Sequence, residues 1–160
     1  MAIAVADRRH GSRRASRSLR LAAARALAVV GRPGAGVEID VVDDREIRRV
    51  NHAYRGVRRR TDVLAFPLEV PGSASGLLGH IVISADSARR QARRVGVSLT
   101  DELALLVTHG VLHLVGWDDR DPVEADLMHR REREILKGSG RRVPEKLWSG
   151  LIGRSPRRQS

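Results

Sequence analysis

The stretch HGVLHLVGWDD, residues 109–119, carries side chains whose types and spacing suit a metal ion. His109 and His113 are four residues apart, and Asp119 follows six residues later. In a helix, the rise per residue places these two imidazoles about 6 Å apart on one face, where they can share one ion. Gly116 can end the helix in a left-handed conformation and turn the chain back, which brings Asp119 to the same point. The pattern predicts a metal centre with three protein ligands.

Two alternatives stay open within this stretch. Two histidines on a buried helix can be hydrogen-bonded core residues, but the full pattern H-x-x-x-H-x-x-G-x-x-D has the ligand spacing of metzincin peptidases and favours a metal. Asp118 competes with Asp119 as the third ligand. We favour Asp119 because its ten-residue offset from His109 matches that spacing, whereas Asp118 could cap the next turn or hydrogen-bond a ligand imidazole.

Gly110 argues against peptide hydrolysis. Zincin peptidases carry a glutamate general base directly after the first histidine, and here that position has no side chain. A metal ion with an open coordination position can still generate hydroxide near neutral pH and polarise a phosphoryl oxygen, while arginines neutralise the remaining charge. Phosphodiester hydrolysis is therefore favoured. An iron oxygenase triad also uses two histidines and a carboxylate, but it places its ligands on strands more often than on one helix.

The composition favours a polyanionic partner. The 160 residues carry a net charge of +11, and 28 of the 30 basic residues are arginine, which can fork onto phosphate oxygens. The alternative is that an arginine-rich proteome raises the charge everywhere. Aromatic residues make up only 2% of the chain, which argues against base stacking as the main means of recognition and favours contact with a nucleic-acid backbone.

The chain contains no cysteine, so the metal donors must be His, Asp or Glu, and a reducing compartment is compatible with the composition. No apolar run reaches the roughly eighteen residues of a membrane span. The basic stretch 8–30 could be a transit peptide, but a strand at 3–5 and a surface helix at 19–30 are favoured because the sheet needs a covering helix. We expect a cytoplasmic protein.

The order of the elements predicts a single α/β (α+β) domain. Besides the two elements just named, strands are expected at 37–42, 62–70 and 77–84, and helices at 44–54, 85–95, 99–115 and 122–137. The helix at 99–115 is apolar almost all round, so it should be central and buried and carry the metal site. We expect a small mixed, mostly parallel sheet of about four strands packed with about five helices.

The predicted domain is a metallo-hydrolase that spans residues 1–137. It includes a basic loop at 55–61. Residues 138–160 are basic and rich in glycine and serine, and we expect them to form a flexible C-terminal tail.

Four segments resemble the YbeY family of bacterial endoribonucleases. HGVLHLVGWDD is similar to its motif H-G-x-L-H-L-x-G-[YW]-D-H, and NHAYRGVRRRTDVLAFP (51–67) is similar to its segment N-x-x-[YF]-R-x-x-x-x-T-[DN]-V-L-[ST]-F-P. LLGHIVIS (77–84) resembles its L-G-[DE]-I-x-I-S strand, and the helix over 128–136 resembles its closing M-x-x-x-E-x-x-I-L element. The resemblance covers residues 37–137. It implies a small α/β fold with a mixed sheet, a zinc ion, and cleavage of single-stranded RNA in 16S rRNA 3′-end maturation and 70S ribosome quality control.

Residue by residue, the resemblance implies that His109 and His113 bind the metal and that Arg55 faces the substrate phosphate as the catalytic arginine. Its neighbours in the basic loop are expected to bind RNA together with it, namely Arg58, Arg59 and Arg60. These assignments place an anion-binding loop beside the metal.

The chain departs from the family pattern at two positions. Asp119 stands where the family usually has histidine, which adds negative charge at the ion and leaves manganese, iron or nickel open beside zinc. His80 stands where the family usually has an acid. It is either an extra polar group near the site or an exposed histidine at a strand end.

The sequence thus predicts a single-strand-specific, metal-dependent endoribonuclease with one divalent ion per chain, Zn²⁺ being the first candidate. Its expected partners are single-stranded RNA, 16S rRNA and the ribosome, with no membrane and no small-molecule cofactor. The alternative is a noncatalytic RNA-binding ribosome-assembly factor, in which a structural metal only pins the helix end to the following loop. A closed coordination shell would distinguish that factor from an enzyme, which needs an open position.

Overall fold

The computed structural model describes residues 3–7, 13–54, 58–60, 62–68, 76–138, 140 and 142–149, with the backbone alone at 13–14 and 58–60. The strands are β1 (Ile3–Asp7), β2 (Gly36–Val42), β3 (Arg58–Arg60), β4 (Val63–Pro67) and β5 (Leu77–Ser84). The helices are α1 (Arg13–Val29), α2 (Asp44–Ala53), α3 (Ala85–Val95), α4 (Leu99–Leu114) and α5 (Pro122–Lys137), followed by the short 3₁₀ helix η1 (Glu145–Trp148).

The five strands form one mixed sheet in the order β1-β2-β5-β4-β3. The pairs β1–β2 and β2–β5 are parallel, and the pairs β5–β4 and β4–β3 are antiparallel. The predicted α/β class, mixed sheet and five helices are confirmed. The fifth strand, β3, lies within the predicted basic loop at 55–61; three consecutive arginines have no alternation of apolar and polar residues, so the pattern could not reveal a strand.

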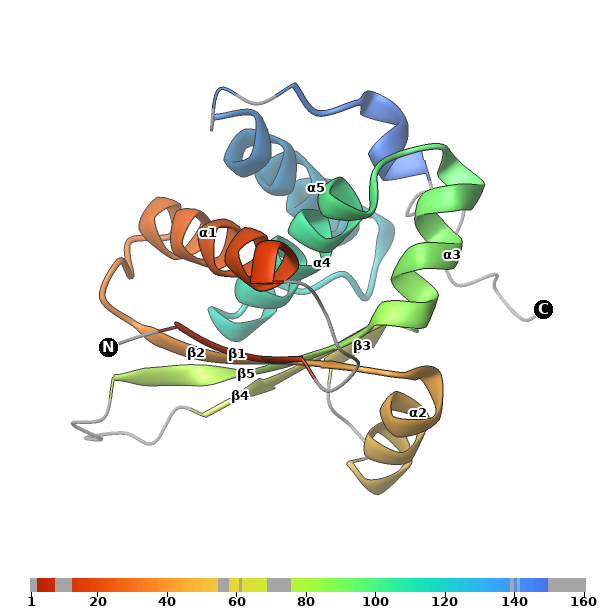
Figure 1. The fold of residues 1–160 in the computed structure, drawn as a ribbon. Helices are drawn as coiled ribbons and strands as arrows, with labels where there is room; N and C mark the ends of the chain where they lie inside the picture. Colours follow the sequence, from red (N-terminus) through yellow and green to blue (C-terminus); the bar gives the residue numbers. More distant parts are fainter. Residues whose placement is uncertain are drawn as a thin grey trace.

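Helices cover the two faces of the sheet unequally. Figure 1 shows α1, α3, α4 and α5 on one side of the sheet and α2 on the other. The larger core lies on the side of α4, and a smaller cluster, formed by Val42, Ile47, Leu64 and Val82, lies under α2. Alternate residues of β2, β4 and β5 therefore point to different cores.

Helix α4 is the central helix, as its apolar sequence predicts: thirteen of its sixteen residues are buried. Its N-cap is Ser98, whose hydroxyl accepts a hydrogen bond from the backbone N–H of Asp101 at 3.1 Å. It lies close against β5, because a Cβ atom built on Gly110 would be 2.9 Å from Cδ1 of Ile81. Gly110 is thus required by the close contact between helix and sheet.

The predicted flexible tail must be corrected for residues 142–149. Leu147 and Trp148 of η1 are buried against Leu105 of α4 and Leu136 of α5, and the guanidinium of Arg133 lies 5.0 Å from the centre of the Trp148 ring. These two apolar side chains cover a side of α4 and α5 that would otherwise face water, so burial outweighs the entropy of a loose chain. Residues 150–160 lie outside the described residues.

Within the described ranges, no single helix is long and apolar enough to cross a membrane. The pair α3 and α4 reaches that length and composition together, but the two helices are bent by 119° at their junction.

Candidate metal centre

Three predicted donors converge at the C-terminal end of α4. Nε2 of His109 lies 2.9 Å from Nε2 of His113. The carboxylate oxygens of Asp119 lie 3.4 Å from Nε2 of His109 and 3.6 Å from Nε2 of His113. One ligand atom from each residue lies within 4.8 Å of the other two, which is a group that could hold a metal ion.

The end of α4 places the third donor. The backbone N–H of Gly116 donates to the carbonyl of His113 at 3.1 Å, and that of Trp117 donates to the carbonyl of Leu112 at 3.0 Å. Gly116 has a φ of 101°, a conformation that a side chain would strain. The chain therefore reverses there, as predicted, and carries Asp119 back over the helix end.

Hydrogen bonds at Nδ1 orient both imidazoles. Nδ1 of His113 lies 2.9 Å from the carbonyl oxygen of Trp117, and Nδ1 of His109 lies 3.0 Å from Oε2 of Glu132. A carbonyl and a carboxylate accept hydrogen bonds, so both partners are satisfied by the tautomer with the proton on Nδ1, and in that tautomer each ring presents a lone pair on Nε2. Two lone pairs and a carboxylate facing one point repel one another unless a cation lies among them. These nitrogen and oxygen donors fit a divalent metal such as zinc.

Glu132, the glutamate of the closing M-x-x-x-E-x-x-I-L element, is a member of this site to which the sequence analysis gave no role. It lies on α5, its side chain is fully buried, and its second oxygen, Oε1, is 2.6 Å from Nδ1 of His129. Burial alone would raise the pKa of this carboxyl, but the hydrogen bonds from His109 and His129 hold the pKa below its ordinary value. A signal was present in the sequence: Glu132 is four residues from Met128 and three from Ile135, on the apolar stripe of its helix.

The geometry also separates the two competing aspartates. Oδ1 of Asp118 accepts a hydrogen bond from the backbone N–H of Asp119 at 2.8 Å, and Oδ2 lies 2.9 Å from Nε of Arg120. These contacts of Asp118 lie within the turn, which is one of the two roles expected for it, while Asp119 belongs to the donor group.

A family model described as "Endoribonuclease YbeY" matches residues 9–140. The chain belongs to the YbeY endoribonuclease family. Among its relatives, the endoribonuclease YbeY of Anaeromyxobacter sp. (strain Fw109-5) is 41% identical over 140 residues, which cover 88% of this chain and 73% of the relative. That of Anaeromyxobacter dehalogenans (strain 2CP-C) is 43% identical over 127 residues, which cover 79% of this chain and 66% of the relative.

A relative from a further genus is also named endoribonuclease YbeY, and a solved structure has a similar fold. The endoribonuclease YbeY of Xanthomonas campestris pv. campestris (strain B100) is 45% identical over 111 residues, 66% of this chain and 69% of the relative. The solution structure of TM1509 from Thermotoga maritima superposes with a TM-score of 0.58 at 22% identity, covering 96% of this chain and 93% of that one. The latter likeness supports the fold alone.

His80, one of the two departures from the YbeY pattern, lies away from the donors. It lies within β5 rather than at its end, and its Nε2 is 2.9 Å from Oδ2 of Asp40 on β2. Its neighbour Ile81 faces Gly110 of α4, so His80 points to the opposite face of the sheet. Both expectations for His80 are therefore wrong: it is a half-buried partner of Asp40.

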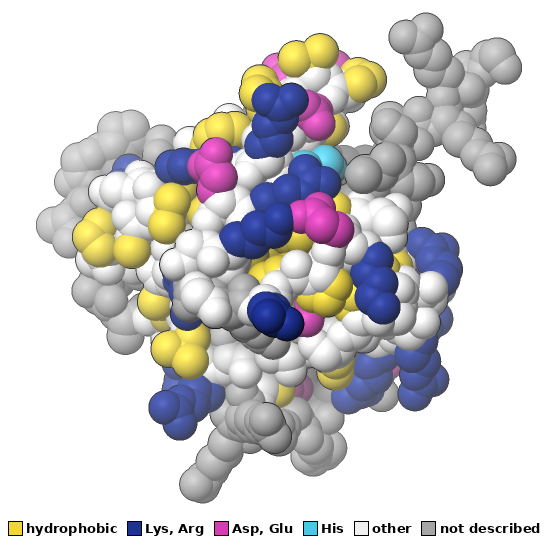
Figure 2. Space-filling model, turned by 90° about the horizontal axis from the view of Figure 1, so that it is seen from above, with side chains coloured by type: hydrophobic (Ala, Val, Ile, Leu, Met, Phe, Trp, Pro, Cys, Tyr) yellow, Lys and Arg dark blue, Asp and Glu magenta, His cyan; other side chains and the backbone are white. Residues whose placement is uncertain are grey.

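The side chains of the four expected RNA-binding arginines lie outside the described residues. Arg55 lies outside the described residues, and Arg58, Arg59 and Arg60 form β3, with only their backbone described. Over the face in Figure 2, Lys and Arg side chains are interspersed with Asp and Glu. The contact of these arginines with RNA stays a prediction.

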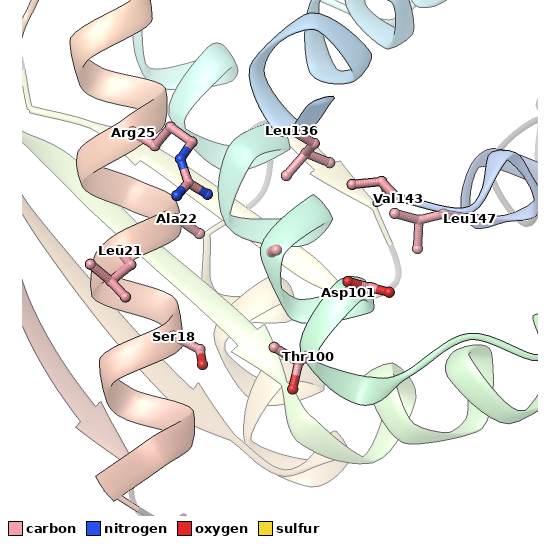
Figure 3. A pocket seen from close by; sticks show the side chains of 10 residues that line it. Ser18, Leu21, Ala22, Arg25, Thr100, Asp101, Leu136, Val143 and Leu147 are labelled. Carbon is pink, nitrogen blue, oxygen red and sulfur yellow. The ribbon is translucent and has the colours of Figure 1, made fainter. Parts of the chain in front are cut away.

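A hollow of about 130 Å³ lies at the other end of α4 (Figure 3). It is bounded by α1, the first turns of α4, the end of α5 and η1, and its lining is mostly apolar apart from Arg25, Asp101 and two hydroxyl groups. Neither metal-facing histidine lines it. Ala104, the lining residue of α4 nearest to the donors in sequence, precedes His109 by more than one helical turn, so the hollow and the donor group are separate sites.

Proposed function

We propose that this YbeY-family chain is a metal-dependent endoribonuclease that cleaves single-stranded RNA, with one divalent ion bound by His109, His113 and Asp119. The observation that carries the proposal is the convergence of two Nε2 lone pairs and a carboxylate on one point. The relatives, which are named endoribonucleases, support RNA as the substrate. Zn²⁺ is the first candidate because imidazole and carboxylate donors suit it.

The metal ligands and the arginines have different roles in the proposed reaction. A divalent ion bound here would supply a Lewis acid for a phosphoryl oxygen and a source of hydroxide near neutral pH. Gly110 has no side chain that could act as a general base, so the glutamate that follows the first histidine in zincin peptidases is absent here. Arg55 is the proposed catalytic arginine, which neutralises the phosphate as charge builds, and Arg58, Arg59 and Arg60 hold the RNA backbone.

We further propose 16S rRNA as the physiological substrate, with roles in its 3′-end maturation and in 70S ribosome quality control in the cytoplasm. The support is the resemblance of four segments of the chain, taken in order, to the YbeY pattern. The net charge of +11 suits a partner as anionic as the ribosome.

Elemental analysis and RNA cleavage test the proposal together. The purified protein should contain about one divalent ion per chain and cut a single-stranded RNA, and a chelator should remove both the ion and the activity. Arg55→Ala should keep the ion and lose cleavage, whereas His109→Ala should lose both. A protein that binds both metal and RNA but leaves the RNA intact would instead support the noncatalytic assembly factor.

A further inference from the structure

We propose that Glu132, held in place by His129, is a positioning residue for the metal centre: it fixes the ring of His109 and supplies a second negative charge beside the ion. The inference rests on the proposed metal site. His129, Glu132 and His109 form one hydrogen-bonded chain that joins α5 to α4. His109 is one of the three donors, whereas Glu132 and His129 lie outside that group.

Glu132 occupies a position where a carboxylate is costly. Its side chain is fully buried, on the same stripe of α5 as Met128 and Ile135. An apolar residue there would pack α5 against α4 without the cost of removing a charge from water. A carboxylate at this position therefore indicates a task that an apolar side chain could not perform.

The contacts of the two carboxylate oxygens of Glu132 indicate what this task is. Oε2, 3.0 Å from Nδ1 of His109, keeps the proton on Nδ1 and directs the lone pair of Nε2 towards His113 and Asp119. Asp119 and Glu132 together carry two negative charges, one at the ion and one behind an imidazole ligand. This charge balances a divalent cation, and a carboxylate behind a histidine also makes the ring a stronger donor.

His129 acts on the other oxygen. Its Nδ1 is 2.6 Å from Oε1, and its side chain is 14% exposed, so it lies between Glu132 and solvent. By occupying Oε1, it keeps the carboxylate turned so that Oε2 stays on His109. The second metal-facing histidine needs no such pair, because the backbone carbonyl of Trp117 orients His113.

The competing explanation is that Glu132 merely ties α5 to α4. Such a tie would change the stability of the metal-free and metal-bound protein equally and leave the metal affinity unchanged. A positioning role changes the affinity itself and the ligand field at the ion. The two roles therefore differ in measurements that do not depend on RNA cleavage.

The experiment measures Zn²⁺ affinity by competition with a chelator and the absorption spectrum of the Co²⁺-substituted protein. Glu132→Gln should weaken Zn²⁺ binding by about 10- to 100-fold and shift the Co²⁺ bands. The matched control is Glu134→Gln, on the same helix, where the side chain is 63% exposed and paired with Arg131. This control removes the same charge and should leave both readouts unchanged.

A double-mutant cycle tests the part of His129. His129→Ala should weaken Zn²⁺ binding in the parent and have little further effect in Glu132→Gln, because it acts through that carboxylate. Full additivity, or parental affinity in Glu132→Gln, would overturn the inference. If Glu132→Gln fails to fold, His129→Ala alone must still weaken Zn²⁺ binding. A parent chain that binds no Zn²⁺, Mn²⁺, Fe²⁺ or Ni²⁺ would overturn the proposed metal site as well, which separates the two failures.

Discussion

Gly110→Ala should destabilise the protein, although alanine is the better helix former. The new Cβ would lie 2.9, 3.0 and 3.2 Å from Cδ1, Cγ2 and Cγ1 of Ile81, which is completely buried. Carbon atoms pack best at about 3.5–4.0 Å. Rotation about χ2 moves Cδ1 but neither Cγ2 nor Cγ1, so relief of these contacts needs either a change of χ1 within the packed core or a shift of α4 or β5.

The expected size follows from two opposing effects. Replacing glycine by alanine inside a helix stabilises by about 1 kcal/mol, whereas overpacking a well-filled core costs about 1–3 kcal/mol. We expect a net loss of about 1 kcal/mol in the free energy of unfolding, or about 2–4 °C in Tm for a chain of this size. Thermal unfolding of the metal-free protein measures this difference directly.

Two controls identify the contact with Ile81 as the cause. Gly34→Ala is the matched substitution, because a Cβ there would meet no atom within 4 Å, and it should change Tm little. Ile81→Val removes the closest atom, so Gly110→Ala should cost less in that background than in the parent. If Gly110→Ala is as stable as the parent, or if Ile81→Val brings no relief, the packing explanation of Gly110 is refuted.

Three further predictions concern the metal, RNA and acid stability. His113→Ala should lose the stabilisation that Zn²⁺ gives the parent, about 2.7 kcal/mol at an ion concentration 100 times Kd, as measured by Tm with and without Zn²⁺; an unchanged response would remove His113 from the ligand set. If four loop arginines contact phosphates, the affinity for single-stranded RNA should fall about 50-fold between about 50 and 200 mM salt, as measured by fluorescence anisotropy. An affinity that does not change with salt would mean that the positive charge reflects an arginine-rich proteome and not RNA binding. Hydrogen bonds from Arg90, Ser84 and Ser87 hold the pKa of Asp44 below its ordinary value, so Asp44 stabilises the fold above its unfolded pKa of about 4 and this contribution is lost as the pH falls. Asp44→Asn should therefore lower Tm more at pH 7 than at pH 2, and an equal loss at both values would contradict this assignment.

The local parts of the metal site could be predicted from the sequence. The spacing of His109 and His113 fixes one helix face, and Gly116 marks the reversal that returns Asp119. Each of these signals acts over a few residues of one helix and its cap. Helical geometry is regular enough that such spacings translate directly into distances.

The parts that the sequence left open depend on contacts between distant segments. Glu132 meets His109 only because α5 packs against α4, which no spacing along the chain specifies. The burial of Trp148 likewise depends on an uncovered side of α4 and α5. The absence of a side chain at Gly110 argues against a peptidase, and packing also explains it. A glutamate at this position would have to displace the buried side chain of Ile81.

The third donor supplies the last prediction, since Asp119 stands where the YbeY pattern has histidine. Its carboxylate lies near both Nε2 atoms and adds a charged oxygen to two neutral nitrogens. Oxygen ligands suit manganese, whereas imidazole favours zinc, copper and nickel. Asp119→His should therefore raise the ratio of the Mn²⁺ Kd to the Zn²⁺ Kd, as measured by chelator competition. Asp118→Asn is the matched control and should leave this ratio unchanged, because Asp118 contacts the side chain of Arg120 and the backbone N–H of Asp119. An unchanged ratio in Asp119→His would mean that residue 119 does not coordinate the ion, and the centre would then contain only the two histidines of α4.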